Sequence, residues 1–182
     1  MVLMNTPLCN FGEKMHSFKL LNIDNSFIDS ASITGEKGTL IMFICNHCPY
    51  VKAVIDLIVE TSNELKKIGI NSIAIMPNDI KKYPEDNFER MIEFANQNKM
   101  SFPYLLDENQ TVAKNYGAVC TPDFFGFNSN KELNYRGRLI EMNNLKAISK
   151  KNELLEAMTI IASTGNGPRQ QFPSAGCSIK WK

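Results

Sequence analysis

The sequence predicts an α/β fold in which helices cover both faces of a mixed central sheet, with a strand pair near the N-terminus and an irregular C-terminal tail. Two patterns lead to this class. Short apolar runs typical of strands alternate with apolar residues at the helical period, which implies parallel strands joined by right-handed crossovers. A later hairpin pattern adds antiparallel strands at one edge. Apolar residues make up 43% of the 182 residues and charged residues 21%, which excludes a disordered chain.

The first predicted elements are strands. In residues 17–34, apolar side chains flank the turn residues Asp24 and Asn25, which predicts a short strand pair. Residues 39–44 form a continuous β-prone run, as expected of a strand buried on both faces. One helix is then expected between Pro49 and Gly69, because its apolar residues recur at helical spacing and glycine ends a helix.

The remaining elements follow the same two periods. They are a strand at 70–76, a helix opened by Pro84, a strand at 102–106, a helix at 108–116, a hairpin at 124–127 and 133–135, and a last helix ended by Gly165. Residues 1–165 are therefore expected to form one domain. Residues 166–182, rich in Gly, Pro and Gln, are expected to form an irregular tail that packs on or near it.

Charge and hydropathy limit the partners. Twenty basic and nineteen acidic residues leave a net charge of +1, so we expect no nucleic-acid partner. The longest apolar run, residues 40–45, is too short to cross a bilayer, so no membrane association is expected. Residues 1–7 lack the charged and apolar regions of a secretory signal, and a cytoplasmic location is expected.

The strongest chemical signal is Cys45-Asn46-His47-Cys48 at the junction between the buried strand and the following helix. Amides at a helix start favour a thiolate, so we expect the pKa of Cys45 to fall below about 8.5. Cys48, one turn along, is able to close a disulfide with Cys45. A protonated His47 beside the thiolate would stabilise the reduced form and tune the pair.

The alternative interpretations of this pair are a zinc site and two inert buried thiols. Zinc needs two further ligands, and the spare candidates lie far apart in the sequence: Cys9, Cys120, Cys177 and His16. Five cysteines, an odd number, also disfavour a structural disulfide framework. Redox chemistry is therefore the favoured interpretation, with no metal and no other cofactor expected.

Several segments together carry a family resemblance: residues 45–52, 83–86, 116–125 and 176–182. The chain resembles the thioredoxin-like superfamily and, more narrowly, the peroxiredoxin-like proteins related to alkyl hydroperoxide reductase and thiol-specific antioxidant. The resemblance implies a cis peptide bond at Pro122, opposite the cysteines. It also implies that the backbone of Thr121 is offered to a substrate peptide or mixed disulfide.

Departures from the peroxiredoxin pattern weaken a peroxidase interpretation. That pattern, Pro-x-x-x-Thr-x-x-Cys, would require proline at 38 and Thr or Ser at 42, where the chain has Gly38 and Met42. The peroxide-activating arginine of the family is missing around residues 120–122. Arg136 and Arg138 are interpreted as solvated residues of an edge strand. Without a hydroxyl and a guanidinium, a fast peroxide reaction loses its electrostatic support.

The buried acid of thioredoxin is also missing, since the corresponding position holds Thr39. Asp79 is an alternative proton acceptor, although turn chemistry is the favoured role for it. Cys120 is interpreted as equally suited to redox chemistry and to packing. For Cys177, docking of the tail with Trp181 as its anchor is favoured over a role as a resolving thiol.

The predicted function is that of an intracellular thiol–disulfide oxidoreductase in which Cys45 attacks a protein or small-molecule disulfide and Cys48 resolves the mixed disulfide. His47 tunes the pair, and Thr121 and Pro122 position the substrate. A thioredoxin or glutathione system would recycle the enzyme. The alternative is an antioxidant peroxidase in which hydroperoxide oxidises Cys45 and another cysteine resolves it. A non-catalytic or metal-holding module is the third possibility.

Overall fold

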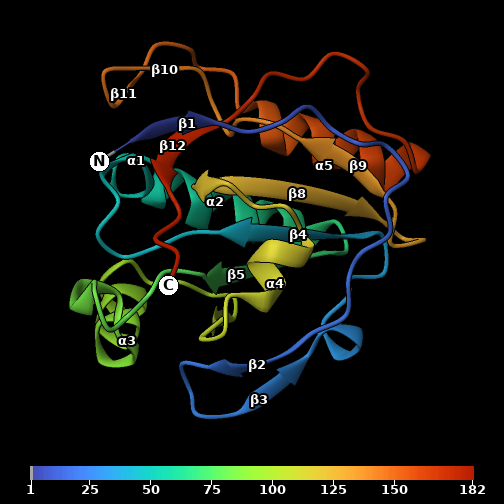
Figure 1. Ribbon diagram of the computed structural model, residues 1–182. Coiled ribbons are helices and arrows are strands. Elements are labelled where there is room, and N and C mark those ends of the chain that lie inside the picture. The colour runs from blue at the N-terminus through green and yellow to red at the C-terminus, as the bar shows by residue number, and fades with distance from the viewer. Residues whose placement is uncertain (1) are drawn as a thin grey trace.

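The computed structural model describes residues 2–182 (Figure 1). Its strands are β1 (Leu3–Asn5), β2 (Lys19–Asn22), β3 (Phe27–Asp29), β4 (Gly38–Phe43), β5 (Ile70–Met76), β6 (Tyr104–Leu106), β7 (Cys120–Thr121), β8 (Asp123–Asn128), β9 (Leu133–Arg136), β10 (Met142–Asn143), β11 (Lys146–Ala147) and β12 (Ala175–Ser178). Its α-helices are α1 (Pro49–Lys52), α2 (Ile55–Lys67), α3 (Phe88–Gln97), α4 (Thr111–Asn115) and α5 (Glu153–Thr164).

The central sheet has seven strands in the order β3-β2-β6-β5-β4-β8-β9. The strands β4, β5 and β6 run parallel, and the pairs β2–β3, β2–β6, β4–β8 and β8–β9 are antiparallel. This arrangement confirms the predicted mixed sheet and the predicted N-terminal strand pair. The strand β4 lies between β5 and β8, so the chain that follows it leaves from the middle of the sheet.

Two apolar layers cover the sheet. On one face, residues of α2, α3 and α5 pack against β4 and β5. On the other face, residues of α4 pack with the N-terminal segment and Ile179, and Figure 1 shows α4 in front of the sheet with α2 behind it. Helices therefore cover both faces, as predicted. Within residues 2–182, no helix is both long enough and apolar enough to span a membrane.

The helix expected between Pro49 and Gly69 is interrupted. The amide of Val54 bonds the carbonyl of Val51, 3.0 Å away, and Val54 has a φ of −127°, outside the helical region. The chain therefore forms the short helix α1 and then the longer α2. The result is a one-turn element directly after Cys48, separated from the helix that carries most of the buried apolar face.

The prediction that Pro84 opens a long helix is wrong in detail. Pro84 begins a 3₁₀ turn, Pro84–Asp86, and α3 starts only at Phe88. The side chain of Asn87 accepts a hydrogen bond from the amide of Arg90 at 2.9 Å, which makes Asn87 the N-cap of α3. Asp86 consequently lies in a turn, and its carboxylate faces into the protein.

The C-terminal tail is more regular than predicted. Residues 166–174 contain no helix or strand, but β12 pairs with β1 on one side and β7 on the other in a second, three-stranded sheet. Gly176 allows this close approach, because a Cβ atom there would lie 2.2 Å from the carbonyl oxygen of Thr121. The tail is thus fixed beside the residue that precedes Pro122.

The expectation of solvated arginines after the hairpin is also wrong. Arg136 is buried, and its guanidinium lies 2.9 Å from the carboxylate of Asp123, which has no exposed surface. Arg138 forms a bidentate contact with Glu153, with distances of 2.7 and 3.1 Å. Burial of an isolated charge is costly, so the carboxylate partner is what makes the buried position of Arg136 tolerable.

Candidate redox site

Three sulfur atoms meet around Thr121. The thiol of Cys45, which follows β4, lies 3.3 Å from the Thr121 hydroxyl. The sulfur of Cys48, which precedes α1, lies 3.1 Å from the Thr121 carbonyl oxygen, to which it donates only in its thiol form. The sulfur of Cys48 also lies 3.0 Å from the sulfur of Cys177, beyond the S–S bond length of about 2.05 Å. We call Cys45, Cys48 and Cys177 the sulfur cluster.

The sheet topology brings these residues together. The strand β8 lies beside β4, so Pro122, just before β8, comes opposite the end of β4. The peptide bond between Thr121 and Pro122 is cis, as the resemblance implied. In the second sheet, Cys177 pairs directly with Thr121. Residues separated by more than 70 positions therefore contact one another around a single threonine.

The electrostatics of the cluster differ from the sequence-based expectation. The pKa of Cys48 is lowered to about 5, chiefly because the Cys45 thiol hydrogen-bonds its sulfur, with further help from Cys177. The pKa of Cys45 is raised, because that thiol serves as the donor to Cys48 and is buried. The prediction of a lowered pKa at Cys45 is therefore wrong.

The position of α1 gives a physical reason. Pro49 is the first residue of α1, which makes Cys48, and not Cys45, the N-cap. The amide of Val51 in the first turn lowers the pKa of Cys48. Cys45 lies three residues earlier and faces the Thr121 hydroxyl instead. The free amides of the helix start thus favour charge on the second cysteine of the motif.

A histidine and a buried carboxylate border the cluster. Nδ1 of His47 lies 2.6 Å from a carboxylate oxygen of Asp86. That contact is the main reason why the pKa of His47 is raised, and the charge of Cys48 adds to the effect. Since the interaction is mutual, an imidazolium at His47 favours the thiolate at Cys48.

The carboxylate of Asp86 has several donors. It accepts hydrogen bonds from the amides of Asn46 and His47, at 2.9 and 3.3 Å, and from the side chain of Asn78 at 2.8 Å. Asn78 in turn accepts from the amide of Lys180, which joins the C-terminal tail to the same network. Tyr83 stacks on the His47 ring with a centroid separation of 5.9 Å. These contacts fix the loop that carries the motif.

Sequence reasoning missed Asp86. Asp79 has the turn role predicted for it, since its side chain accepts a hydrogen bond from the amide of Lys81 at 3.0 Å. Asp86 lies within residues 83–86, one of the segments that carry the family resemblance. Its contact with His47 spans 39 residues, so only the fold reveals it.

The same residues are the possible metal ligands. The ligand atoms of Cys45, His47 and Asp86 all lie within 4.8 Å of one another. Because the Asp86 carboxylate already accepts from His47 and from neighbouring donors, a metal ion bound there would have to replace those hydrogen bonds. The arrangement fits a hydrogen-bonded network that stabilises thiolate and imidazolium charges.

The other predicted site residues are placed as follows. Cys120 is buried, and its thiol donates to the Pro122 carbonyl at 3.7 Å. The backbone of Thr121, predicted to be offered to a substrate, pairs with Cys177 in this structure. The tail pairs with the rest of the chain through β12. Lys114 lies over the Trp181 ring at 5.7 Å, and 39% of Trp181 is exposed.

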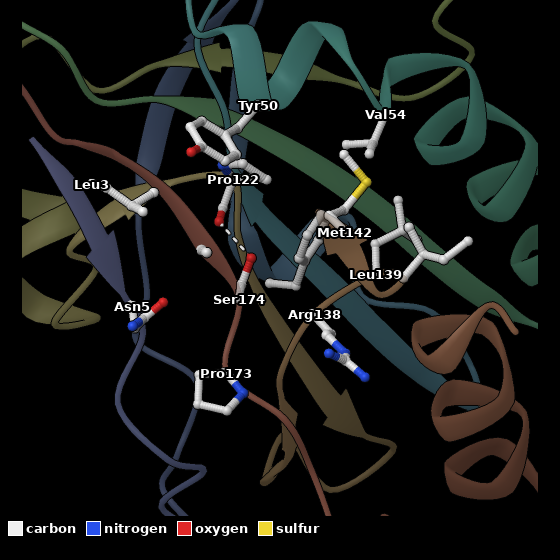
Figure 2. A pocket seen from close by; sticks show the side chains of 13 residues that line it. Leu3, Asn5, Tyr50, Val54, Pro122, Arg138, Leu139, Met142, Pro173 and Ser174 are labelled. Atoms are coloured by element: carbon white, nitrogen blue, oxygen red, sulfur yellow. Dashed lines mark hydrogen bonds between the residues drawn. The ribbon is translucent and has the colours of Figure 1, made fainter. Parts of the chain in front are cut away.

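A pocket of about 300 Å³ lies next to Pro122 (Figure 2). Figure 2 shows Tyr50 and Val54 of the segment after the motif on one side and Ser174 on the other. The hydroxyl of Ser174 donates to the Pro122 carbonyl at 3.0 Å. The lining is largely apolar, with Arg138 as its charged member. Such a concave apolar surface with few polar groups is typical of small-ligand sites.

Comparison with known proteins places the chain in context. The AhpC/TSA family model matches residues 11–140. No curated protein matches the chain. An uncharacterized conserved protein from Geobacillus kaustophilus is 37% identical with a TM-score of 0.94, and the match covers 100% of this chain and 97% of that one. A hypothetical protein from Sinorhizobium meliloti 1021 is 29% identical with a TM-score of 0.91, covering 98% of each chain.

A more distant structure has an assigned activity. It is a secreted Mycobacterium tuberculosis disulfide oxidoreductase homologous to E. coli DsbE, 16% identical with a TM-score of 0.59, and the match covers 80% of this chain and 95% of that one. At this identity the likeness concerns the fold alone. Together the comparisons confirm the thioredoxin-like architecture that the resemblance implied.

Proposed function

The chain belongs to the AhpC/TSA family, and on that premise we propose that it is a thiol–disulfide oxidoreductase whose redox pair is Cys45 and Cys48. The observation that carries this proposal is the placement of the Cys45 and Cys48 sulfurs at the hydroxyl and the carbonyl of Thr121, at 3.3 and 3.1 Å, where hydrogen bonds from the neighbouring thiols lower the pKa of Cys48. A dithiol in which one sulfur is ionised at neutral pH is suited to exchange with a disulfide.

The first step is attack by Cys45. In the reduced protein the Cys45 thiol donates to the Cys48 thiolate, so transfer of that proton to Cys48 leaves the charge on Cys45. The Thr121 hydroxyl, 3.3 Å from Cys45, then donates to the new thiolate. Cys45 attacks one sulfur of the substrate disulfide, the substrate S–S bond breaks, and the other half leaves as a thiolate.

The second step is resolution by Cys48. The departing thiolate takes up the proton held by Cys48, and Cys48 attacks the Cys45 sulfur of the mixed disulfide. The second half of the substrate leaves as a thiolate, which takes up a proton from solvent, and a Cys45–Cys48 disulfide forms. The substrate is reduced by two electrons and the pair is oxidised by two. A cellular thiol reductant of the thioredoxin or glutathione class would restore the dithiol.

The residues around the pair have supporting roles in this proposal. His47, held by Asp86, keeps a positive charge near Cys48 and lowers the free energy of the thiolate. Because β12 occupies the backbone of Thr121, the pocket beside Pro122, which is lined by Tyr50 and Pro122 and not by the cysteines themselves, is proposed to hold part of the substrate. Its apolar lining would receive an apolar group of the disulfide substrate.

Trapping of mixed disulfides tests this proposal. Reduced Cys48→Ser protein should accumulate an adduct on Cys45 when treated with bis(2-hydroxyethyl) disulfide, because no second thiolate removes it. Cys45→Ser should form no adduct at Cys48, and Cys120→Ala should behave as wild type. Intact-mass analysis after acid quenching reads each result. An adduct on Cys48 in Cys45→Ser would reverse the two roles, and a wild-type protein that leaves the disulfide unreduced would overturn the activity.

One observation favours a second candidate, a hydroperoxide peroxidase. The Thr121 hydroxyl beside Cys45 supplies the polar hydrogen that the sequence lacks at Met42. Hydroperoxide would oxidise Cys45 to a sulfenic acid, and Cys48 would condense with it to release water. Stopped-flow oxidation of reduced protein by one equivalent of hydroperoxide distinguishes the two. Oxidation faster than reaction with a disulfide would favour the peroxidase, and the reverse order favours the oxidoreductase.

A further inference from the structure

Cys177 lies inside the site rather than in a peripheral tail. It belongs to the middle strand of the second sheet, pairs with Thr121, and has 2% of its surface exposed. Its sulfur lies 3.0 Å from that of Cys48. Closing this gap to a disulfide bond requires the sulfurs to approach by about 1 Å.

Cys48 is the centre of the cluster. The Cys48 thiol donates to the sulfur of Cys177 at 3.0 Å, and once Cys48 is ionised, hydrogen bonds from the Cys45 and Cys177 thiols favour its thiolate. We propose that Cys177 is a third redox cysteine, which attacks the Cys45–Cys48 disulfide and converts it into a Cys48–Cys177 disulfide. This inference rests on the proposed function, because that activity forms the first disulfide. The substrate disulfide is the oxidant, and the exchange needs no other.

The exchange balances within the cluster. The sulfur of Cys177 attacks the sulfur of Cys48, and the bond between Cys48 and Cys177 forms as the bond between Cys45 and Cys48 breaks. The electron pair of the broken bond stays on Cys45, which takes up the proton released by Cys177. The protein carries one disulfide before and after this step, so no net oxidation occurs.

The surroundings of Cys177 change in a favourable direction once the first disulfide exists. In the reduced protein, the pKa of Cys177 is raised to about 12 by burial and by its interactions with the Cys48 sulfur. A Cys48 sulfur held in a disulfide carries no negative charge, so it no longer raises the pKa of Cys177 by repulsion. The charge of Lys180 and the amide of Tyr50 continue to favour the thiolate.

The exchange changes the state of Cys45 and the attachment of β12. Cys45 becomes a thiol again while the protein remains oxidised, and it lies beside the Thr121 hydroxyl. The strand β12 becomes covalently attached to the residue that caps α1. The disulfide therefore joins Cys177 of the tail to Cys48 of the motif, and it no longer includes Cys45, the sulfur that attacks the substrate.

Disulfide mapping of the wild-type protein tests the proposal directly. Reduced protein is treated with one equivalent of bis(2-hydroxyethyl) disulfide, quenched in acid, alkylated and digested for mass spectrometry. We expect most molecules to contain Cys48–Cys177 with Cys45 alkylated, after an earlier phase with Cys45–Cys48. A final majority of any other pairing would overturn the proposal. If no intramolecular disulfide forms, the proposed function fails as well, so the two failures are distinguishable.

A variant gives an independent measurement. Cys177→Ala should retain only the Cys45–Cys48 disulfide. Its equilibrium constant for oxidation by glutathione disulfide should fall roughly tenfold, or about 30 mV for this two-electron couple. Cys120→Ala removes a buried cysteine one register position away and should leave the constant unchanged. An unchanged constant in Cys177→Ala would contradict the inference. The wild-type mapping decides the matter if that variant does not fold.

Discussion

Cys120 and the sulfur cluster differ sharply although they lie side by side. Cys120 pairs with Ser178 in the second sheet, and the next residue, Thr121, pairs with Cys177. Neighbouring residues of a strand face opposite ways, so Thr121 points at the cluster while the Cys120 thiol bonds the Pro122 carbonyl. Burial raises the pKa of Cys120, whereas Cys48, equally buried, has a lowered pKa.

The difference shows what activates a buried thiol in this protein. Desolvation alone keeps a thiol neutral, as at Cys120. At Cys48 the hydrogen bonds from two thiols and the amide of Val51 outweigh the same desolvation. Each region also has its own buried carboxylate, Asp123 near Cys120 and Asp86 near Cys48. Asp123 is neutralised by an arginine and Asp86 contacts a histidine.

The largest expected effect is on the rate of disulfide reduction, which should depend on Cys45 in the sulfur cluster and not on Cys120. Cys45→Ser should reduce the rate of disulfide reduction by more than about 1000-fold, because a hydroxyl is a poor substitute for the attacking sulfur. Cys120→Ser should retain most of the activity. Steady-state reduction of bis(2-hydroxyethyl) disulfide measures both. Comparable losses in the two variants would remove the distinction between the regions.

The second prediction concerns the buried ion pair on the Cys120 side. Arg136→Met leaves Asp123 buried without its partner and should lower the free energy of unfolding by about 3–5 kcal/mol. Burial already raises the pKa of Asp123 to about 6, and loss of the guanidinium should raise it further. The folded variant then binds a proton more readily than the unfolded chain, so its loss of stability should be smaller at pH 5 than at pH 8.

Urea denaturation at the two pH values measures this effect. The thiolate titration of the same variant should remain near that of the wild type. The reason is that Asp123 lies near Cys120, and Cys120 and the sulfur cluster are on opposite sides of β7. A loss of stability independent of pH would contradict the assignment of Asp123 as the group left without its counter-ion.

The third prediction concerns the imidazole beside the cluster. His47→Gln removes the positive charge near Cys48 and should raise the pKa of that thiol by roughly one pH unit, a tenfold change in ionisation. The pH at which iodoacetamide reacts half-maximally measures the shift. His16→Gln is the matched control, since His16 contacts Tyr116 on the other face of the sheet. Equal profiles for His47→Gln and wild type would exclude electrostatic tuning by His47.

The smallest effect is expected at Thr121. Thr121→Val keeps the shape of the side chain and removes the hydroxyl that contacts Cys45. Loss of one hydrogen bond of about 0.5–1.5 kcal/mol should slow formation of the mixed disulfide by roughly 2- to 12-fold. Rapid-quench alkylation of Cys48→Ser, with and without the added change, isolates this step. A rate unaffected by the change would mean that the hydroxyl does not stabilise the attacking sulfur.

Local patterns predicted much of the fold. The apolar run that forms β4, the strand β5 and the hairpin of β8 and β9 all follow from short-range periodicity. The cis bond at Pro122 followed from the family resemblance and is present. These features depend on neighbouring residues or on a motif, so a single sequence contains the information needed to expect them.

The details that set the chemistry depend on contacts between distant segments. The four residues of β12, Ala-Gly-Cys-Ser, show no apolar alternation, so pairing with β7 was not predictable. Arg136 resembles a solvated residue until the fold supplies Asp123. The start of α1 after Cys48 is a local feature, but the helix amides were expected to act on Cys45, whereas Cys48 is the N-cap.

Ultraviolet titration of the reduced protein at 240 nm tests the central claim most directly. The account predicts that one equivalent of thiolate appears with a midpoint well below the pKa of an unperturbed cysteine and that Cys48→Ser abolishes this transition. Cys120→Ala should leave it in place. If all thiols of the wild-type protein instead ionise at or above the pKa of about 8.5 typical of an unperturbed cysteine, the hydrogen-bonded sulfur cluster does not activate a thiol and the account is contradicted.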